Sequence, residues 1–356
     1  MSQSRWQALW LVHSRKRGWL AHLLWPVSQV YAGLTALRRT LYALGIFKTH
    51  RIQVPVIVIG NVVVGGAGKT PTVIAVVNHL RDQGWRPGVV SRGHGRHSQE
   101  IVEVRPDMPS EECGDEPALI RQRTGVPVFV AASRVAAAST LVGAHPEVDV
   151  LVCDDGLQHW ALHRDLQIVV FDDRGTGNGW LLPAGLLREA WPRGSSGGPL
   201  PDLVLHQHRE DALAPPRISA PGASPFSATR RLADHAVGPT GERMPLHELR
   251  THRLTAVAGI ARPSVFFDML HARGLRPERE VGLHDHADAA DYAALIQDAE
   301  CTLLCTEKDA VKLFPLLAET PPASRVQAWA VPLELTPDPA FFNTLDHRLH
   351  TLGRKP

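Results

Sequence analysis

The sequence predicts an α/β fold in which a parallel-sheet domain follows an N-terminal amphipathic helix and precedes a second, smaller α/β domain. Three observations predict it: apolar runs alternate with helical segments, a glycine-rich loop separates the first run from a helix, and residues 1–81 contain no acid. The expected ranges are 1–50 for the helical segment, 51–225 for the first sheet and 226–356 for the second domain. The strands expected in the first sheet are residues 54–59, 87–90, 148–153, 167–171 and 203–205.

Composition places the chain among ordinary globular proteins. Its 356 residues and 44% hydrophobic content exceed what one small core needs, which indicates about two domains. Collagen-like, repeat and disulfide-scaffold classes are excluded. The four cysteines are sparse, and Cys301 and Cys305 have no second ligand pair at zinc-site spacing. We expect Cys113, Cys153, Cys301 and Cys305 to be reduced thiols in the core.

The second domain is predicted from apolar runs that alternate with helices. Strands are expected at residues 254–259, 302–305 and 326–331, and helices at 263–273 and 289–300.

The N-terminal segment is basic and apolar. Residues 1–81 contain ten Lys or Arg residues and no Asp or Glu, which leaves 28 basic against 36 acidic residues in the rest, so the net charge of +2 hides an asymmetry. Residues 19–37 lack charge and repeat apolar side chains at helical spacing over roughly 28 Å of helix. Such a helix, rich in tryptophan and flanked by arginines, is typical of a membrane surface that carries anionic lipid. The alternative is a helix docked on its own domain.

A glycine-rich loop follows the apolar residues 53–59 and precedes a helical stretch at 72–82. Strand, loop and helix in this order form a phosphate-binding site, because glycines expose backbone N–H groups and the helix N-terminus adds partial positive charge. Val63 stands where the strict Walker spacing has glycine, and the alternative is a glycine-rich turn with a chance lysine. Lys69 would reach the β- and γ-phosphates. The predicted nucleotide-binding residues are Gly65, Gly66, Ala67, Gly68, Lys69, Thr70 and Pro71.

Two carboxylates, Asp154 and Asp155, follow the apolar run 148–153. Paired carboxylates at the carboxyl end of a strand can hold Mg²⁺ opposite a phosphate loop, directly or through water. Asp also favours strand-to-turn junctions, so the pair is informative because of the loop upstream. The predicted metal ligands are Thr70, Asp154 and Asp155, and the two motifs together predict a P-loop NTPase-like fold.

Further motifs give the chain a specific resemblance. They are the loop at 60–71, Ser-Arg-Gly-His-Gly at 91–95, Gly-Asp-Glu-Pro at 114–117, Asp-Asp-Gly-Leu-Gln-His at 154–159, Leu-Pro-Ala-Gly at 182–185, Leu-Arg-Glu at 187–189, Asp-His at 285–286 and Thr-Glu-Lys-Asp-Ala-Val-Lys at 306–312. In this order they resemble the tetraacyldisaccharide 4'-kinase family, the lipid A 4'-kinases of the bacterial inner membrane.

The resemblance implies an activity and a location. The reaction would use ATP and Mg²⁺ to phosphorylate the 4'-hydroxyl of a tetraacylated glucosamine disaccharide 1-phosphate, the lipid A disaccharide precursor. The enzyme would act at the cytoplasmic face of the inner membrane. A substrate with four acyl chains stays in the bilayer, because each exposed CH₂ costs about 0.8 kcal/mol, and this agrees with a lipid-facing helix.

The resemblance also implies site residues. Asp115 takes the role of proton acceptor for the sugar hydroxyl and pairs with His286, or with His284 if the alignment shifts by two residues, while Lys69 completes the catalytic set. The residues alone allow two other interpretations: Asp115 as the cap of a helix at 117–124, and a solvated surface run at 284–288. The other site candidates are Arg92, Gln158, His159, Arg188 and Glu189.

Two other functions fit parts of the pattern. A P-loop regulatory or metal-chaperone NTPase would act on a protein partner, but the guanine-reading Asn-Lys-x-Asp sequence is absent, and residues 306–309 carry Glu307 in place of the asparagine. A non-catalytic membrane-bound module is disfavoured, because the loop lysine and the paired carboxylates are all present. No nucleic-acid motif appears, so the expected partners are the lipid precursor and the membrane surface.

Overall fold

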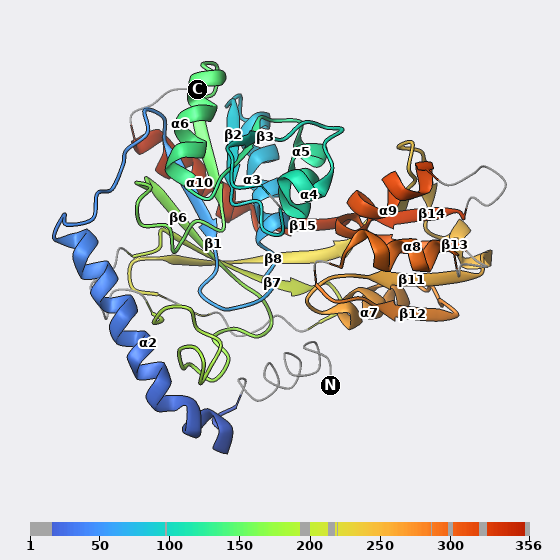
Figure 1. The fold of residues 1–356 in the computed structure, drawn as a ribbon, viewed down its shortest axis with the longest axis horizontal. Helices are drawn as coiled ribbons and strands as arrows, with labels where there is room; N and C mark the ends of the chain where they lie inside the picture. The colour runs from blue at the N-terminus through green and yellow to red at the C-terminus, as the bar shows by residue number, and fades with distance from the viewer. Residues whose placement is uncertain are drawn as a thin grey trace.

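Two β-sheets form the body of the molecule (Figure 1). The computed structural model describes residues 16–96, 98–192, 200–212, 218, 220–285, 287–297, 302–319 and 326–352. The predicted α/β class is confirmed, and the larger sheet is mostly parallel.

The first sheet has nine strands and is parallel except at its two edge strands. Its order is β15 (Leu333–Pro337), β8 (Ser224–Leu232), β7 (Leu203–Arg209), β6 (Leu166–Phe171), β1 (Val56–Gly60), β5 (Val150–Asp154), β2 (Pro87–Ser91), β4 (Val128–Val130) and β3 (Val102–Glu103). The central strands are buried and mostly apolar, because helices or loops cover both faces.

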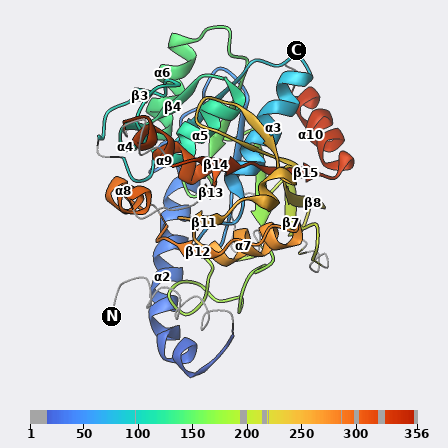
Figure 2. The same cartoon turned by 90° about the vertical axis from the view of Figure 1, so that its right-hand side faces the viewer.

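Helices cover the two faces of this sheet unequally. Apolar side chains of α3 (Lys69–Asp82), α5 (Asp115–Thr124) and α10 (Pro339–Thr351) share one core with the sheet. The short α4 (Ser110–Cys113) adds Cys113 to that core, while α6 (Arg134–Ala144) packs on the other face. Figure 2 shows α3 and α10 side by side, where the rings of His79 and Phe342 stack at 4.1 Å.

The second sheet is smaller and mixed. Its six strands run in the order β10 (Arg243–Pro245), β9 (His235–Val237), β14 (Ala328–Val331), β13 (Thr302–Thr306), β11 (Leu254–Ala258) and β12 (Arg279–Gly282). Helix α7 (Pro263–Ala272) packs on one face, and α8 (Ala289–Gln297) and α9 (Glu307–Glu319) pack on the other. A 3₁₀ turn at Glu248–Thr251 follows β10.

The chain enters the second unit from β8 and returns to the first sheet. β15 pairs antiparallel with β8, with Leu333 opposite Leu232, and α10 then packs on the first core. The expected division at residue 225 differs from this arrangement, because it falls inside β8 and because β15 and α10 lie in the range 226–356 that was assigned to the second domain. Because this pairing joins residues far apart in the sequence, no local sequence pattern indicates that β15 returns to the first sheet.

Helix α2 (Trp19–Ala43) runs along the outer side of the first unit (Figure 1). One side is docked: the Ser28 hydroxyl donates to the Leu181 carbonyl at 3.1 Å, and the Tyr31 hydroxyl donates to the Arg188 carbonyl at 2.9 Å. The other side exposes large apolar residues, among them Trp19 at 75% and Leu23 at 66%. The helix therefore combines a docked face with an apolar face that the described residues leave uncovered.

The parallel register brings several strand ends to one edge. β1 lies between β5 and β6, with Ile59 opposite Asp154 and Gly60 opposite Val169. The residues that follow these three strands therefore meet at the carboxyl edge of the sheet, where ligands of open α/β sheets bind.

Candidate active site

The glycine-rich loop connects β1 to α3, and the side chain of Gln207 on β7 binds its Gly68 carbonyl. Gly68 has φ +75°, and a Cβ at this position would lie 1.9 Å from Oε1 of Gln207 on β7, so only glycine fits. The amide of Gln207 donates to the Gly68 carbonyl at 2.8 Å and to the Thr72 hydroxyl at 2.6 Å. Sequence reasoning missed Gln207, because nothing local to β7 indicates that it faces the loop.

Val63 explains the departure from the Walker spacing. It is fully buried and forms an isolated bridge with Leu187, while the Val64 N–H donates to the Leu186 carbonyl at 2.9 Å. The first half of the loop is thus paired with residues 186–188. This pairing places Arg188 beside the end of β5.

Lys69 begins α3 and is nearly buried, as is Thr70 beside it. The Lys69 Nζ lies 3.8 Å from Oδ2 of Asp155, which follows β5. Lys69, the predicted phosphate-binding lysine, and Asp155, a predicted metal ligand, therefore form an ion pair beside the loop.

Asp154 and Asp155 have different surroundings. Asp154 is 1% exposed; the Ser91 hydroxyl donates to its Oδ2 at 3.0 Å, and its Oδ1 has no hydrogen-bond partner among the described residues. Burial, together with the charges of Glu116 and Asp155, raises the pKa of Asp154 to about 7. Burial would also raise the pKa of Asp155, but the charges of Lys69 and Arg188 outweigh it and lower that pKa. Asp154 thus keeps an open acceptor, whereas Asp155 is paired.

The residues predicted as metal ligands fit a magnesium ion in the chemistry of their donor atoms. The orphaned Asp154 oxygen and the Thr70 hydroxyl are hard oxygen donors at the same sheet edge. No group of three or more His, Cys, Asp or Glu that could hold a metal occurs among the described residues. A site of this kind would hold Mg²⁺ with one or two carboxylates and leave the other positions to phosphate and water.

The remaining candidates near β5 form one polar cluster. The Arg188 Nη1 lies 3.3 Å from Oδ2 of Asp155, and the Gln158 amide donates to Oε1 of the buried Glu189 at 2.6 Å. Burial and the charges of Arg134 and Arg164 lower the pKa of His159 to about 4, so this ring is neutral near pH 7.

Arg92 and Arg134 flank this cluster from different elements. Arg92 is exposed after β2, and its charge adds to the lowering of the His159 pKa. Sequence reasoning missed Arg134, which is buried in the first turn of α6 and donates to the Asp155 carbonyl at 3.3 Å.

Asp115 lies in the first turn of α5 and does not cap it. The helix is preceded by Gly114 at φ +94° with no side-chain cap, and the buried Asp115 carboxylate pairs with Nζ of Lys312 on α9 at 3.0 Å. His284 pairs instead with Asp291 at 2.9 Å. His286, the predicted partner of Asp115, lies outside the described residues.

A cavity of about 230 Å³ lies between the phosphate loop and the second unit. The loop residues 66–71 form one end, and charged side chains of both units line it, among them Glu116, Arg230, Asp285 and Lys308. The wall opposite is apolar and consists mainly of Ile260, Val265, Phe266, Met269, Val331 and Leu333.

Arg230 is a cavity residue that sequence reasoning missed. It lies on β8, is 8% exposed, and its Nε has no hydrogen-bond partner among the described residues. Burial lowers its pKa despite the nearby carboxylates of Asp172 and Asp173. A buried guanidinium beside a phosphate loop adds positive charge to this end of the cavity.

Comparison with known proteins gives one consistent result. The family model described as tetraacyldisaccharide-1-P 4'-kinase matches residues 20–350. The tetraacyldisaccharide 4'-kinase of Polaromonas naphthalenivorans (strain CJ2) is 53% identical over 340 residues, which cover 95% of this chain and 94% of the relative. The enzyme of the same name from Acidovorax sp. (strain JS42) is 53% identical over 337 residues, with 95% and 93% covered.

A solved structure agrees with these relatives. The crystal structure of LpxK from Aquifex aeolicus in complex with ATP has a TM-score of 0.76 and 26% sequence identity, and covers 93% of this chain and 99% of its own. The resemblance noted from the motifs is thereby confirmed. The chain belongs to the tetraacyldisaccharide-1-P 4'-kinase family.

Proposed function

We propose that this kinase transfers the γ-phosphoryl group of ATP to the 4'-hydroxyl of a tetraacylated glucosamine disaccharide 1-phosphate at the carboxyl edge of the first sheet. One observation carries the proposal: the glycine-rich loop and Lys69 form one end of a cavity that both units line, and Asp155 after β5 lies 3.8 Å from the Lys69 Nζ. Family membership identifies the reaction class, and this arrangement supports its location at the carboxyl edge of the first sheet.

ATP would lie in the cavity with its phosphates against the loop. Backbone N–H groups of the loop and the N-terminus of α3 bind phosphate, and the apolar wall around Phe266 suits the base. The cations Lys69, Arg230 and Lys308 line this space and favour a polyanion. The ATP in the Aquifex aeolicus complex supports this assignment.

Thr70, Asp154 and Asp155 would hold Mg²⁺. Asp154 offers the open oxygen, Thr70 a hydroxyl, and Asp155 a carboxylate already shared with Lys69 and Arg188. When bound, the ion would neutralise charge on the β- and γ-phosphate oxygens.

The chain's own residues account for the other requirements of phosphoryl transfer. Lys69 neutralises the γ-phosphate and is oriented by Asp155. A sugar hydroxyl is a poor nucleophile, so a carboxylate must accept its proton, and Asp115 takes this role. The ammonium of Lys312 lies 3.0 Å from Oδ1 of Asp115, so the two side chains form an ion pair. Because Lys312 belongs to the second unit, the position of that unit affects the base.

Membrane association would bring the enzyme to its lipid substrate. Helix α2 exposes Trp19, Leu23, Val27, Val30, Leu34 and Leu37, while its other side is docked on residues 181–188. We place this apolar face in the headgroup region of an anionic leaflet at the cytoplasmic face of the inner membrane. Within the described part of the chain, no helix is both long and apolar enough to cross a bilayer.

The first prediction concerns the reaction. Purified full-length protein in detergent should move ³²P from γ-labelled ATP to the tetraacyl disaccharide 1-phosphate in the presence of Mg²⁺, and Lys69→Ala should abolish transfer. Thin-layer chromatography of the lipid measures the product. Absence of transfer, or equal release of label to water without lipid, would contradict the kinase assignment. Release of the label to water alone, with none in the lipid, would favour the regulatory NTPase alternative.

The second prediction concerns the base. Asp115→Asn should lower kcat by about 10² or more, because general-base catalysis typically contributes 10²–10⁴, while the Kd for ATP stays within about twofold. Asp107→Asn is the matched control, since that side chain is 84% exposed and pairs only with Arg105 at 3.9 Å among the described residues. Steady-state kinetics and thermal melting are measured together. An unchanged kcat would exclude Asp115 as the base.

The third prediction concerns α2. Leu23→Glu with Leu34→Glu should lower binding to vesicles of phosphatidylethanolamine and phosphatidylglycerol by about tenfold or more, because each exposed leucine loses its apolar transfer energy. Ile101→Glu adds one such charge at an exposed apolar residue outside α2 and should leave binding unchanged. Flotation measures the bound fraction. Equal binding by all three proteins would remove α2 as the membrane-binding surface.

A further inference from the structure

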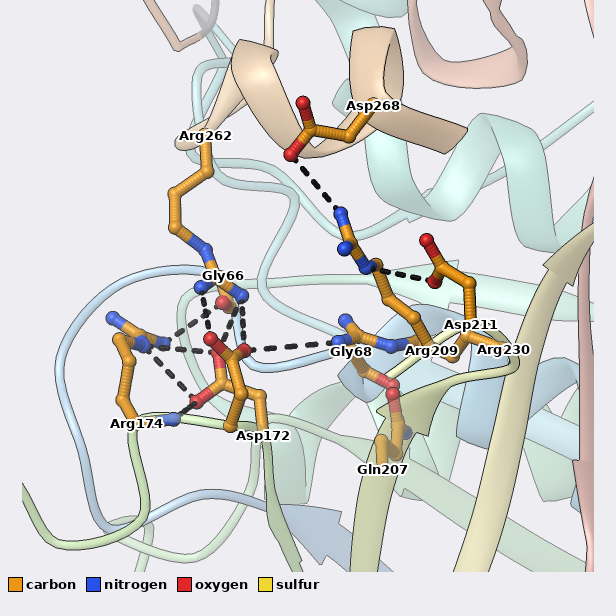
Figure 3. Close-up of polar contacts among 11 residues, drawn as sticks. Gly66, Gly68, Asp172, Arg174, Gln207, Arg209, Asp211, Arg230, Arg262 and Asp268 are labelled. Carbon is orange, nitrogen blue, oxygen red and sulfur yellow. Dashed lines mark hydrogen bonds and ion pairs between the residues drawn. The ribbon is translucent and has the colours of Figure 1, made fainter. Parts of the chain in front are cut away.

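Asp172 is a buried carboxylate outside the predicted site that is shared by two arginines from different units (Figure 3). It follows β6 and is 1% exposed. Arg174 Nε donates to both of its oxygens, at 3.0 and 2.9 Å, and Arg262 Nη2 donates to its Oδ2 at 3.0 Å. One carboxylate therefore connects a loop of the first unit to the residue that precedes α7 in the second unit.

Arg174 binds the back of the phosphate loop. Its Nη1 donates to the Val64 carbonyl and its Nη2 to the Gly66 carbonyl, both at 2.9 Å. In a trans peptide the carbonyl and the following N–H point in opposite directions, so these bonds turn the N–H groups of Gly65 and Ala67 away from Arg174. Arg174 thus sets the orientation of N–H groups that would face phosphate.

Arg262 carries the same connection into the second unit. Its guanidinium also binds Asp173, at 2.9 and 2.8 Å, and it lines the cavity beside Ile260 and Val265. The side chain of Arg174 is 3% exposed and that of Asp172 is 0% exposed, so losing either arginine leaves a buried charge incompletely paired. Arg262, which lies beside the apolar wall, and Arg174, which binds the loop, therefore donate to the same acceptor, Asp172.

We propose that Asp172 is a positioning residue that couples the placement of the second unit to the conformation of the phosphate loop, and so to ATP binding. The proposal rests on the proposed function, in which ATP phosphates bind this loop. With Arg262 in place, Asp172 holds Arg174 in the orientation that binds both loop carbonyls. When Arg262 is lost, Asp172 is held by Arg174 alone, so the two side chains can shift together. The orientation of Arg174 toward the Val64 and Gly66 carbonyls is then less restrained.

A second contact between the units provides a matched control. Arg209, at the end of β7, binds Asp268 on α7 at 3.0 Å and Asp211 at 3.1 Å. Its side chain is 25% exposed, against 20% for Arg262. No contact of Arg209 with the phosphate loop occurs among the described residues. Arg209→Ala therefore removes an ion pair between the units without touching the Asp172 connection.

The experiment is a double-mutant cycle on the full-length protein, read by calorimetric titration with ATP and Mg²⁺. Arg262→Ala should raise the Kd for ATP about tenfold, the loss expected for a hydrogen bond between charged groups, whereas Arg209→Ala should change it less than about twofold. In the Asp172→Asn background, Arg262→Ala should add less than about twofold, because the shared acceptor is already gone. The KM for ATP should rise with the Kd, while kcat at saturating ATP stays within about threefold.

Two outcomes overturn the proposal. A full effect of Arg262→Ala in the Asp172→Asn background would show that Arg262 acts directly on ATP, and equal losses from Arg262→Ala and Arg209→Ala would show only general contact between the units. If Asp172→Asn does not fold, the cycle is run with Arg174→Lys in its place. Additive losses of ATP affinity from Arg174→Lys and Arg262→Ala would then show that Arg262 acts directly on ATP. A wild-type protein that binds no ATP would overturn the proposed function itself, which separates the two failures.

Discussion

The conformation of the loop after β1 is the constraint on which the rest of the site depends. Glycines permit this conformation but do not hold it; side chains from distant strands do. Gln207 fastens the Gly68 carbonyl from β7, and Arg174 fastens Val64 and Gly66 from the end of β6. These groups occupy the carbonyl side of the loop, so its N–H groups are available to a ligand. A parallel sheet makes this possible because the ends of β1, β6 and β7 lie at one edge.

The local parts of this arrangement were predictable from sequence, and the non-local parts were not. Apolar runs, the glycine loop and the carboxylates after β5 are encoded within a few residues, and their strands form as expected. The return of β15 to the first sheet depends on pairing with β8, and the contact between Asp115 and Lys312 joins two units. No local pattern indicates the pairing of β15 with β8, and although Asp115 and Lys312 each lie in a motif, neither motif indicates that the two residues pair.

Buried arginines show the same limit. Arg134, Arg174 and Arg230 lie in segments without any nucleotide-binding pattern, and each becomes relevant only when the fold brings it to the loop or the β5 edge. The roles of Asp115, Asp154 and Arg188 stay predictions, but the structure shows which groups each of them contacts. Arg188 connects α2 to the site: its carbonyl accepts from Tyr31, and its guanidinium lies 3.3 Å from Asp155. Arg188 therefore contacts both helix α2 and the carboxylate that follows β5.

If the loop and the β5 edge bind the triphosphate and its metal together, a crystal structure with a non-hydrolysable ATP analogue and Mg²⁺ will show both at this edge. We expect β- and γ-phosphate oxygens against the N–H groups of residues 65–70 and a metal about 2.1 Å from oxygens of Thr70 and Asp154. A triphosphate outside this loop, or a metal held without either residue, would contradict it.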